Sequence, residues 1–414
     1  MMRWMKMAWI LPFLLGFSAC SSDEGSDEAD WLKGEPDLLY PKTKTGALYT
    51  ESTVVEFDIG FSDEVWEAFV AAWKPVKDSD TWFHCSFAFA GERFLDAACR
   101  HKGNSSDPQS ETKPQFIVRF DKWDDTGRFF GVRRIDLEVF PEFAAPVRGR
   151  VAMRMMREAG LPAPRVNNAR VTVNGTLMGL YQNIEVIDHE FLEQRFDTPI
   201  GNLYHQDGNG WHLDTNSSTG NIGLMSNLET LVDAWSALNG GDATSYEEQL
   251  ATSLNINTVL QETAAEMVLP VCDNFSNGGW NYYFYQMADG QLILLPWDLD
   301  QVLSDRAPPE ADVWVFLGNR ANSNETPGIG LDLRTFLFSN AGWKSTYEDF
   351  VVAFRDGPFA SAKDRIARIC AQIRPVFEED PNAYGTLDDF DQDCANLQER
   401  ITQRITYLQG VLGR

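Results

Sequence analysis

Residues 271–300 constrain this chain more than any other segment. They read VCDNFSNGGWNYYFYQMADGQLILLPWDLD. Two strand-like apolar runs, residues 282–286 and 291–295, flank an Asp-Gly dipeptide that is typical of tight hairpin turns. Because an antiparallel hairpin brings its two open ends together, we expect Asn281 and Asp298 to be near neighbours.

Asp273 precedes this hairpin, where an expected helix enters a loop rich in Gly and Asn. An amide oxygen and a carboxylate are suitable ligands for Mg²⁺ or Mn²⁺, which fill their other positions with water and phosphate oxygens. A second carboxylate that does not hold the metal can accept a proton from a hydroxyl nucleophile. The pattern therefore indicates phosphoryl transfer, with Asp273 as base and Asn281 and Asp298 as metal ligands. The alternatives are an ordinary edge turn and, less favoured, a hydrolase with Asp298 and Asp300 as paired carboxylates.

The N-terminus has the layout of a targeting signal. Arg3 and Lys6 precede an apolar run, residues 7–17, which is too short to span a bilayer. Small residues then lead directly into Cys20, as in a bacterial lipobox. We expect a signal peptide over residues 1–19 and a lipidated Cys20; the alternative is an ordinary signal peptide in which Cys20 is incidental.

The segment after Cys20 is polar and acidic, and begins SSDEGSDEAD. Such residues cannot form a packed core, so residues 20–48 are predicted to be a lipidated cysteine and a solvated tether. The expected location is the bacterial cell envelope, at the outer membrane or the cell surface. Contact with the membrane is expected through the anchor at Cys20 only.

Beyond the tether, strand-like segments dominate up to residue 187 and helical ones after it. The first part predicts a hairpin over residues 81–101, and Asn174-Gly175 predicts a second tight turn. Residues 201–223 are rich in Gly, Asn and Ser and are expected to form a loop region. Helices are expected at residues 63–73, 147–159, 226–238, 245–252 and 256–268 and over much of the C-terminal part. The pattern favours an α+β protein of two lobes, an N-lobe at 49–187 and a C-lobe at 188–414.

The cysteines suggest disulfides if the protein is exported. Cys85 and Cys99 lie in the two arms of the expected hairpin and could face each other across it. Cys370 and Cys394, in the last helical region, form a second candidate pair, and Cys272 is left over. The alternative is that the five cysteines after Cys20 are free thiols.

The formal net charge of -26 argues against a nucleic-acid partner. A protein that neutralises phosphates needs clustered Lys and Arg side chains, and here acidic residues are in large excess.

The chain resembles the spore coat protein H (CotH) kinase family over roughly residues 50–414. The motifs that carry the resemblance are HKGNSS (101–106), Lys113, VNGTLMGLYQNIEVID (173–188), GNLY (201–204) and NYYFY with PWDLD (281–300). The resemblance implies a two-lobed atypical protein-kinase-like fold, with a β-rich N-lobe that binds nucleotide and a helical C-lobe that holds the metal and catalytic site. It also implies ATP as phosphoryl donor, Mg²⁺ or Mn²⁺ as cofactor and an unidentified protein substrate with Ser or Thr hydroxyls.

In this family's pattern, Asp273 matches the catalytic aspartate, and Asn281 and Asp298 match the metal site. Lys113 matches the nucleotide-binding lysine, and we expect it to neutralise phosphate charge. The loop amides near Ser105 are expected to approach phosphate. Glu185 falls where a hinge between the lobes would meet adenine, and its backbone is the expected contact.

The chain departs from the family pattern in two places. Lys102 stands where the family has arginine before Gly-Asn-Ser-Ser, and the insertion FSNGG lengthens the loop between Asp273 and Asn281. A displacement near 1 Å costs catalysis on the order of a hundredfold. The expected helix at 147–159 offers only Glu158 as a partner for Lys113. A pseudokinase, an inactive binding or structural protein of the cell envelope, is therefore the alternative to an active kinase.

Overall fold

The structure is a computed structural model of the 414-residue chain. The chain divides into two units, residues 1–36 and 37–414. The structure describes residues 44–73, 81–102, 113–139, 142–196, 201–207, 210–215, 223–237, 244–271, 273–277, 279–314 and 330–412. The expected signal peptide, Cys20, most of the tether, Ser105 and Cys272 lie outside the described residues.

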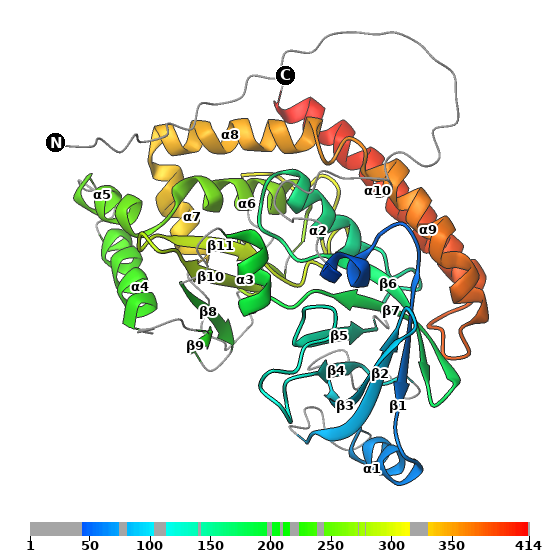
Figure 1. Cartoon of the computed structure of the whole chain (residues 1–414). Coiled ribbons are helices and arrows are strands. Elements are labelled where there is room, and N and C mark those ends of the chain that lie inside the picture. The colour runs from blue at the N-terminus through cyan, green and yellow to red at the C-terminus, as the bar shows by residue number, and fades with distance from the viewer. Residues whose placement is uncertain are drawn as a thin grey trace, which may run out of the picture. The chain divides into compact units, whose positions relative to one another are not determined.

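The first part of the second unit is a closed β-barrel (Figure 1), with strand order β1-β2-β3-β4-β5-β7-β6. Its strands are β1 (Val55–Gly60), β2 (Phe83–Phe89), β3 (Glu92–His101), β4 (Phe116–Arg119), β5 (Arg134–Glu138), β6 (Val166–Val173) and β7 (Thr176–Ile184). Parallel pairing of β6 with β1 closes the barrel, and its other neighbours pair antiparallel. Alternate residues of β1, such as Phe57 and Ile59, are buried, as expected for strands with one face toward a core.

The barrel interior is aromatic. Phe87 contacts the rings of Phe57, Phe120 and Phe129 at centroid distances of 5.0 to 5.6 Å. The short 3₁₀ helix η1 (Lys44–Tyr49) adds Leu48, which is fully buried, to the same core. The expected tether over 20–48 therefore ends too late, because its last residues belong to the folded part.

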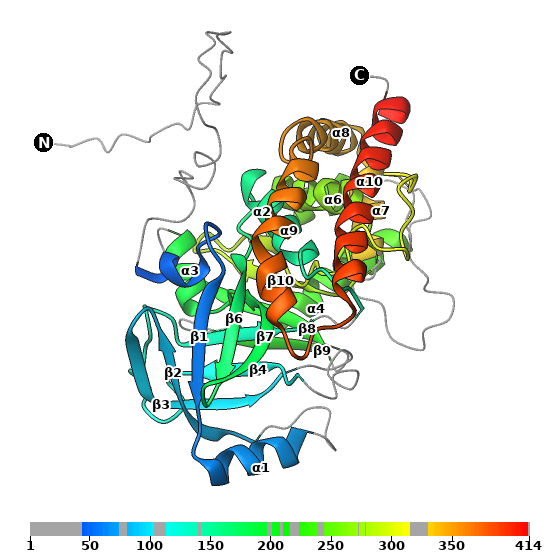
Figure 2. The same cartoon turned by 90° about the vertical axis from the view of Figure 1, so that its right-hand side faces the viewer.

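The helices follow the expected periodic segments closely. Helix α1 (Asp63–Trp73) begins where predicted, and Ser62 Oγ accepts a hydrogen bond from the Val65 N–H at 3.3 Å. The others are α2 (Arg148–Glu158), α3 (His189–Arg195), α4 (Gly223–Ser236), α5 (Thr244–Ser253), α6 (Ile256–Val268), α7 (Gly330–Ser339), α8 (Ala341–Asp356), α9 (Ala362–Glu379) and α10 (Leu387–Leu412). Helices α6 to α10 lie at the opposite end of this unit from β1 to β4 (Figures 1 and 2). The β-rich first part and helical second part confirm the predicted fold class.

A four-stranded sheet lies within the helical part, in the order β11-β10-β8-β9. The predicted hairpin forms β10 (Tyr282–Gln286) and β11 (Leu292–Pro296). The other two strands, β8 (Asn202–Asp207) and β9 (Gly210–Thr215), lie in residues that we expected to be a loop region. That expectation was wrong, since β8 pairs with β10 and buries Leu203 and Tyr204, and composition alone does not reveal this non-local pairing.

Both expected disulfides are present. Cys85 pairs with Cys99 across the β2–β3 hairpin, and Cys370 pairs with Cys394 between α9 and α10. Free thiols at these four positions are therefore excluded. Disulfides persist in oxidising compartments, so these two suggest a location outside the cytoplasm. Within the described ranges, no helix is both long and apolar enough to cross a membrane.

Candidate active site

The open end of the β10–β11 hairpin brings Asn281 and Asp298 together. Tyr282 is paired with Pro296, and the Trp297 N–H donates to the main-chain oxygen of Asn281 at 3.2 Å. Asn281 has φ 59° and Asp298 φ 50°, so both adopt the left-handed conformation that residues other than glycine rarely take. Such backbone strain is concentrated at functional sites. The predicted pair of oxygen ligands therefore stands at one end of one hairpin.

Asp273 joins these two residues through Asn281. The Asn281 Nδ2 donates a hydrogen bond to the main-chain oxygen of Asp273 at 3.0 Å. Burial raises the pKa of the Asp273 carboxyl, while a hydrogen bond from Asn281 and the charge of Arg306 lower it. The loop thus returns to the hairpin, with Asp273 in contact with Asn281, the residue just before β10.

Acidic side chains gather at this end of the hairpin. Burial raises the pKa of the Asp298 carboxyl, the Lys102 ammonium lowers it, and the charge of Asp273 raises it further. Burial also raises the pKa of Asp300 well above its usual range, and the carboxylates of Asp298, Asp273 and Glu142 add to this shift. Several carboxylates close to one another favour a cation between them.

These residues fit a divalent cation. One carboxylate, that of Asp298, and the side-chain oxygen of Asn281 can supply protein ligands, and Mg²⁺ takes few such ligands in phosphate-binding sites. In the part of the chain that the structure describes, no cluster of three or more His, Cys, Asp and Glu side chains is arranged to hold a metal. Among those residues, protein side chains alone therefore do not fill the coordination shell of a metal ion.

Lys102 is the lysine whose positive charge lowers the pKa of Asp298. From the sequence we noted it only as a difference from the family pattern, without a functional role. It follows β3 directly, and its Nζ lies 2.9 Å from Asp136 Oδ2 and also contacts Glu138. The same Nζ lies 5.6 Å from the centre of the Trp297 ring. Its place in HKGNSS, where the family carries an arginine, was the signal that could have identified it.

Lys113 lies in a different environment. Its Nζ is 2.5 Å from Asp380 Oδ2, and both side chains are buried, at 3% and 1% exposure. The same Asp380 oxygen accepts the Leu180 N–H at 2.8 Å, and a Cβ on Gly179 would collide with this carboxylate. Lys113 therefore joins the barrel to the residue that follows α9, whereas Lys102 faces the hairpin.

Glu185 lies at the junction after β7, where the predicted hinge begins. Its carboxylate pairs with both Arg165 and Arg195, and its N–H donates to the main-chain oxygen of Arg165 at 2.9 Å. Burial opposes ionisation, but the two guanidinium groups lower the pKa of Glu185 to about 2. The side chain and the N–H are thus engaged within the protein.

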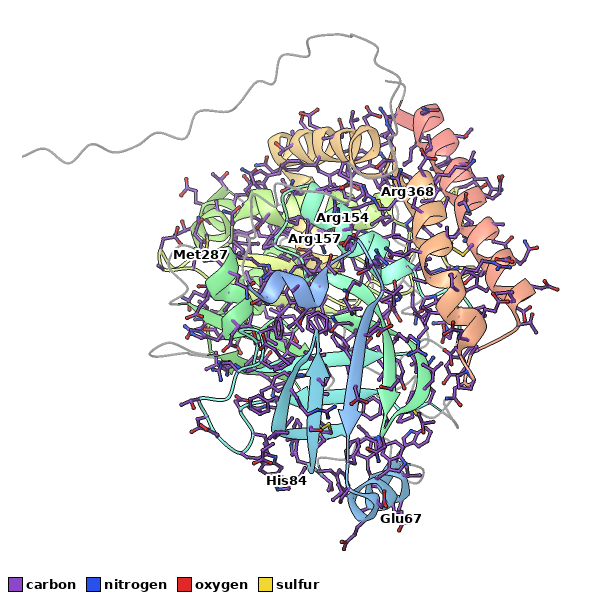
Figure 3. All side chains as sticks on the ribbon, turned by 45° about the vertical axis from the view of Figure 1, so that its right-hand side comes forward. Glu67, His84, Arg154, Arg157, Met287 and Arg368 are labelled. Atoms are coloured by element: carbon purple, nitrogen blue, oxygen red, sulfur yellow. A yellow bond between two sulfur atoms is a disulfide. The ribbon has the colours of Figure 1, made fainter. Side chains whose placement is uncertain are left out.

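Glu158, the one glutamate that the expected helix offers as a partner for Lys113, contacts arginines. It accepts hydrogen bonds from Arg154 Nε at 2.9 Å and from Arg365 Nη2 at 2.8 Å. In Figure 3, Arg154 and Arg157 of α2 lie on the side of this helix that faces Arg368 of α9. Arginines of α2 and α9 thus bind the one glutamate that the sequence offered on this helix as a partner for Lys113.

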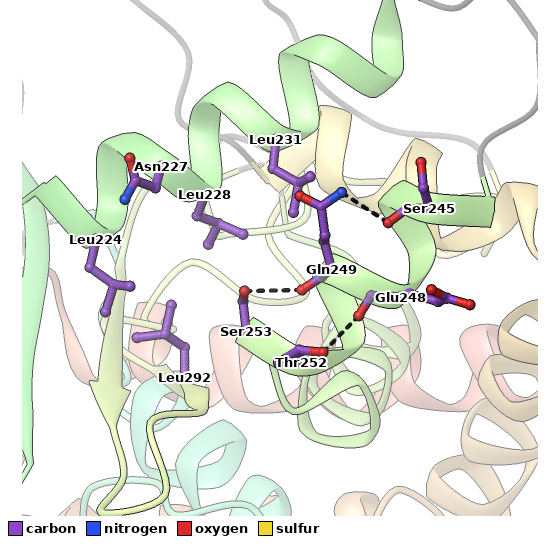
Figure 4. Close-up of a pocket in the computed structure, with 10 residues that line it drawn as sticks. All are labelled: Leu224, Asn227, Leu228, Leu231, Ser245, Glu248, Gln249, Thr252, Ser253 and Leu292. Carbon is purple, nitrogen blue, oxygen red and sulfur yellow. Dashed lines mark hydrogen bonds between the residues drawn. The ribbon is translucent and has the colours of Figure 1, made fainter.

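The described surface also contains a groove of about 520 Å³ between α4 and α5 (Figure 4). Leu224, Leu228 and Leu231 line it on the α4 side. The hydroxyls of Thr252 and Ser253 donate to main-chain oxygens one turn earlier in α5, at 2.9 and 3.0 Å. None of its lining residues is a predicted site residue, so the groove adds nothing to the chemistry at Asp298.

A family model described as CotH kinase protein matches residues 99–408 of this chain. No curated protein matches the chain. Among solved structures, the chain is similar to a protein chain in the complex of the Shewanella oneidensis MR-1 toxin–antitoxin proteins HipA and HipB with their operator DNA. The sequence identity is 11% and the TM-score is 0.30, and the match covers 68% of this chain and 60% of the other chain. It is also similar to the Helicobacter pylori proinflammatory kinase CtkA, with 11% identity and a TM-score of 0.31. This match covers 72% of the present chain and 94% of CtkA. The match thus spans less than two thirds of the first of these chains.

Proposed function

Because the chain belongs to the CotH kinase protein family, we propose that it is an atypical kinase that transfers the γ-phosphoryl group of ATP to Ser or Thr hydroxyls of a protein substrate. The observation that carries this proposal is the contact of Asp273 with Asn281 beside Asp298. These three residues have the order and the chemistry of a base followed by two metal ligands.

Asp273 is proposed to orient the substrate hydroxyl and to accept its proton. A bond then forms between the hydroxyl oxygen and the γ-phosphorus, while the bond from that phosphorus to the bridging oxygen breaks and ADP leaves with the electron pair. Burial raises the pKa of Asp273, which makes its carboxylate a better proton acceptor, and the hydrogen bond from Asn281 holds it in place.

Asn281 and Asp298 are proposed to hold Mg²⁺ or Mn²⁺, which would neutralise phosphate charge. Lys102 is proposed to face the phosphates, because it is the cation that acts on Asp298. Contacts of the loop at Ser105 with phosphate, and of the Glu185 backbone with adenine, are part of the same proposal. For Lys113 we propose an indirect role, since its ammonium is paired with Asp380 after α9, whereas the lysine charge that acts on Asp298 is that of Lys102.

We further propose export and lipid anchoring at Cys20. The two disulfides and the apolar run at residues 7–17 support export, and the small residues before Cys20 support the anchor. Labelling with a palmitate analogue tests this, since wild type should incorporate the lipid and Cys20→Ser should not. Equal labelling of wild type and Cys20→Ser would show that Cys20 is not the lipidated residue.

A pseudokinase that binds a partner or bare nucleotide in the cell envelope is the second candidate. The insertion FSNGG between Asp273 and Asn281 favours it, because loop length affects the position of the base.

The deciding experiment measures transfer of label from ATP in the presence of Mn²⁺ or Mg²⁺. Wild type is compared with Asp273→Ala and Asp298→Ala, and with Asp289→Ala as a control in the exposed hairpin turn. An active kinase gives label with wild type and the control only. If wild type binds nucleotide but transfers nothing, the pseudokinase is correct; equal label in every variant excludes this active site.

A further inference from the structure

The loop between Asp273 and Asn281 is tightly folded in spite of its added length. The main-chain oxygen of Asn274 accepts the Gly279 N–H at 2.8 Å, and Asn274 Oδ1 accepts the Asn277 N–H, also at 2.8 Å. The Phe275 ring is fully buried and lies 4.8 Å from the ring of Tyr282. The described residues of this loop, 274–277 and 279, therefore form a compact turn packed against β10.

A buried carboxylate on α6 holds this turn. Glu266 is fully buried, and its Oε2 accepts the Ser276 N–H at 2.9 Å and also the Ser276 hydroxyl. Helix α6 leads directly into the loop, so Glu266 binds main-chain and side-chain donors that come only a few residues after Asp273.

Burying a carboxylate here is costly, which argues for a specific task. Burial raises the pKa of Glu266 to about 7, while Ser276, Phe275 and Arg334 act to lower it. Glu262, one turn earlier on α6, is also fully buried, and burial with the charge of Glu266 raises its pKa well above the usual range. An apolar side chain would fill the same space at lower cost. The N–H and the hydroxyl of Ser276 are donors that an apolar side chain could not satisfy.

We propose that Glu266 is a positioning residue: its carboxylate fixes the turn at Ser276, so that Asp273 stays in contact with Asn281. This inference rests on the proposed kinase function for its catalytic consequence, but the structural part stands independently.

The test uses three variants of the full chain. Glu266→Ala removes the acceptor, Glu266→Gln keeps an acceptor oxygen of nearly the same shape, and Glu262→Gln is the matched control on the same face of α6. Phosphorylation kinetics should show kcat reduced on the order of a hundredfold in Glu266→Ala with the KM for ATP nearly unchanged. Glu266→Gln should recover most of this loss, and Glu262→Gln should behave as wild type.

Amide hydrogen exchange provides a readout that does not need activity. The amide of Ser276 should exchange faster in Glu266→Ala than in Glu262→Gln, while amides of β10 and β11 stay protected. If Glu266→Ala does not fold, Ser276→Ala removes only the hydroxyl bond and should reduce kcat by a smaller factor. Unchanged exchange at this amide overturns the proposal. An inactive wild type whose loop amides respond as expected overturns the kinase function alone.

Discussion

The side-chain amide of Asn281 donates a hydrogen bond to the main-chain oxygen of Asp273 across 3.0 Å. The two residues are separated by a loop that is longer than the family pattern, yet they lie in contact. Because the acceptor is the main chain of Asp273, replacing the side chain of Asp273 leaves this contact in place. Loss of the base should therefore be separable from loss of the metal.

Asp273→Asn should reduce kcat on the order of 10²- to 10⁴-fold, because the amide cannot accept the proton of the substrate hydroxyl. The shape of the side chain is kept, so the KM for ATP and the affinity for Mn²⁺ should change little. Steady-state phosphorylation assays and Mn²⁺ titration measure these quantities. Asp289→Asn, in the exposed turn of the same hairpin, is the control. Wild-type kcat in Asp273→Asn would show that another group is the base.

Replacement of either lysine by methionine removes an ion pair to a buried carboxylate and should lower stability, but only Lys102→Met should also raise the KM for ATP. Lys102→Met removes the cation beside Asp298 and should raise the KM for ATP about tenfold or more. Lys113→Met leaves Asp380 buried without its ion pair, and should lower the free energy of unfolding by about 3–5 kcal/mol. ATP titrations and urea unfolding of both variants distinguish the roles. A raised KM in Lys113→Met with unchanged stability would assign the phosphates to Lys113.

The parts of the fold that depend on residues close together in the sequence could be predicted from the sequence. The bounds of α6 coincide with the predicted 256–268, because apolar residues recur at helical spacing and Asn255 caps the first turn. The meeting of Asn281 with Asp298 follows from the Asp-Gly turn, which fixes the register of the hairpin between them. The Cys85–Cys99 pair follows from the same kind of local pairing.

Contacts between distant residues could not be predicted in this way. Lys113 and Asp380 are 267 positions apart, and nothing near Lys113 indicates that a residue after α9 will bind it. The strands β8 and β9 form because β10 offers β8 an edge, so their Gly- and Asn-rich composition is overridden by tertiary pairing. Glu266 was missed because a glutamate within a helical pattern usually faces solvent.

The stability of the lobe junction should depend on pH through Glu185. Its pKa is about 2 in the folded protein, below the usual 4.5, so the folded state holds its proton less tightly than the unfolded state. The stabilisation is therefore present above about pH 4.5 and is lost as the pH falls toward 2. Thermal unfolding of wild type and Glu185→Gln should differ most near pH 7 and converge near pH 2.5. A constant difference over this range would mean that the carboxylate does not bear the stabilising charge.

Reduction of the two disulfides should destabilise the two parts of the protein separately. The cysteines are 14 residues apart in the β2–β3 hairpin and 24 apart between α9 and α10. In the loop-entropy model these closures contribute about 3 and about 3.5 kcal/mol at 25 °C. Cys85→Ala with Cys99→Ala, and separately Cys370→Ala with Cys394→Ala, should each lower Tm. The first pair opens the barrel and the second frees α10 from α9, so hydrogen exchange should report loss of protection in different elements.

A reductant should lower the Tm of wild type below that of either double variant, since it opens both bonds. If the reductant leaves the wild-type Tm unchanged, the disulfides do not stabilise this fold and the inference of an oxidising compartment loses its support.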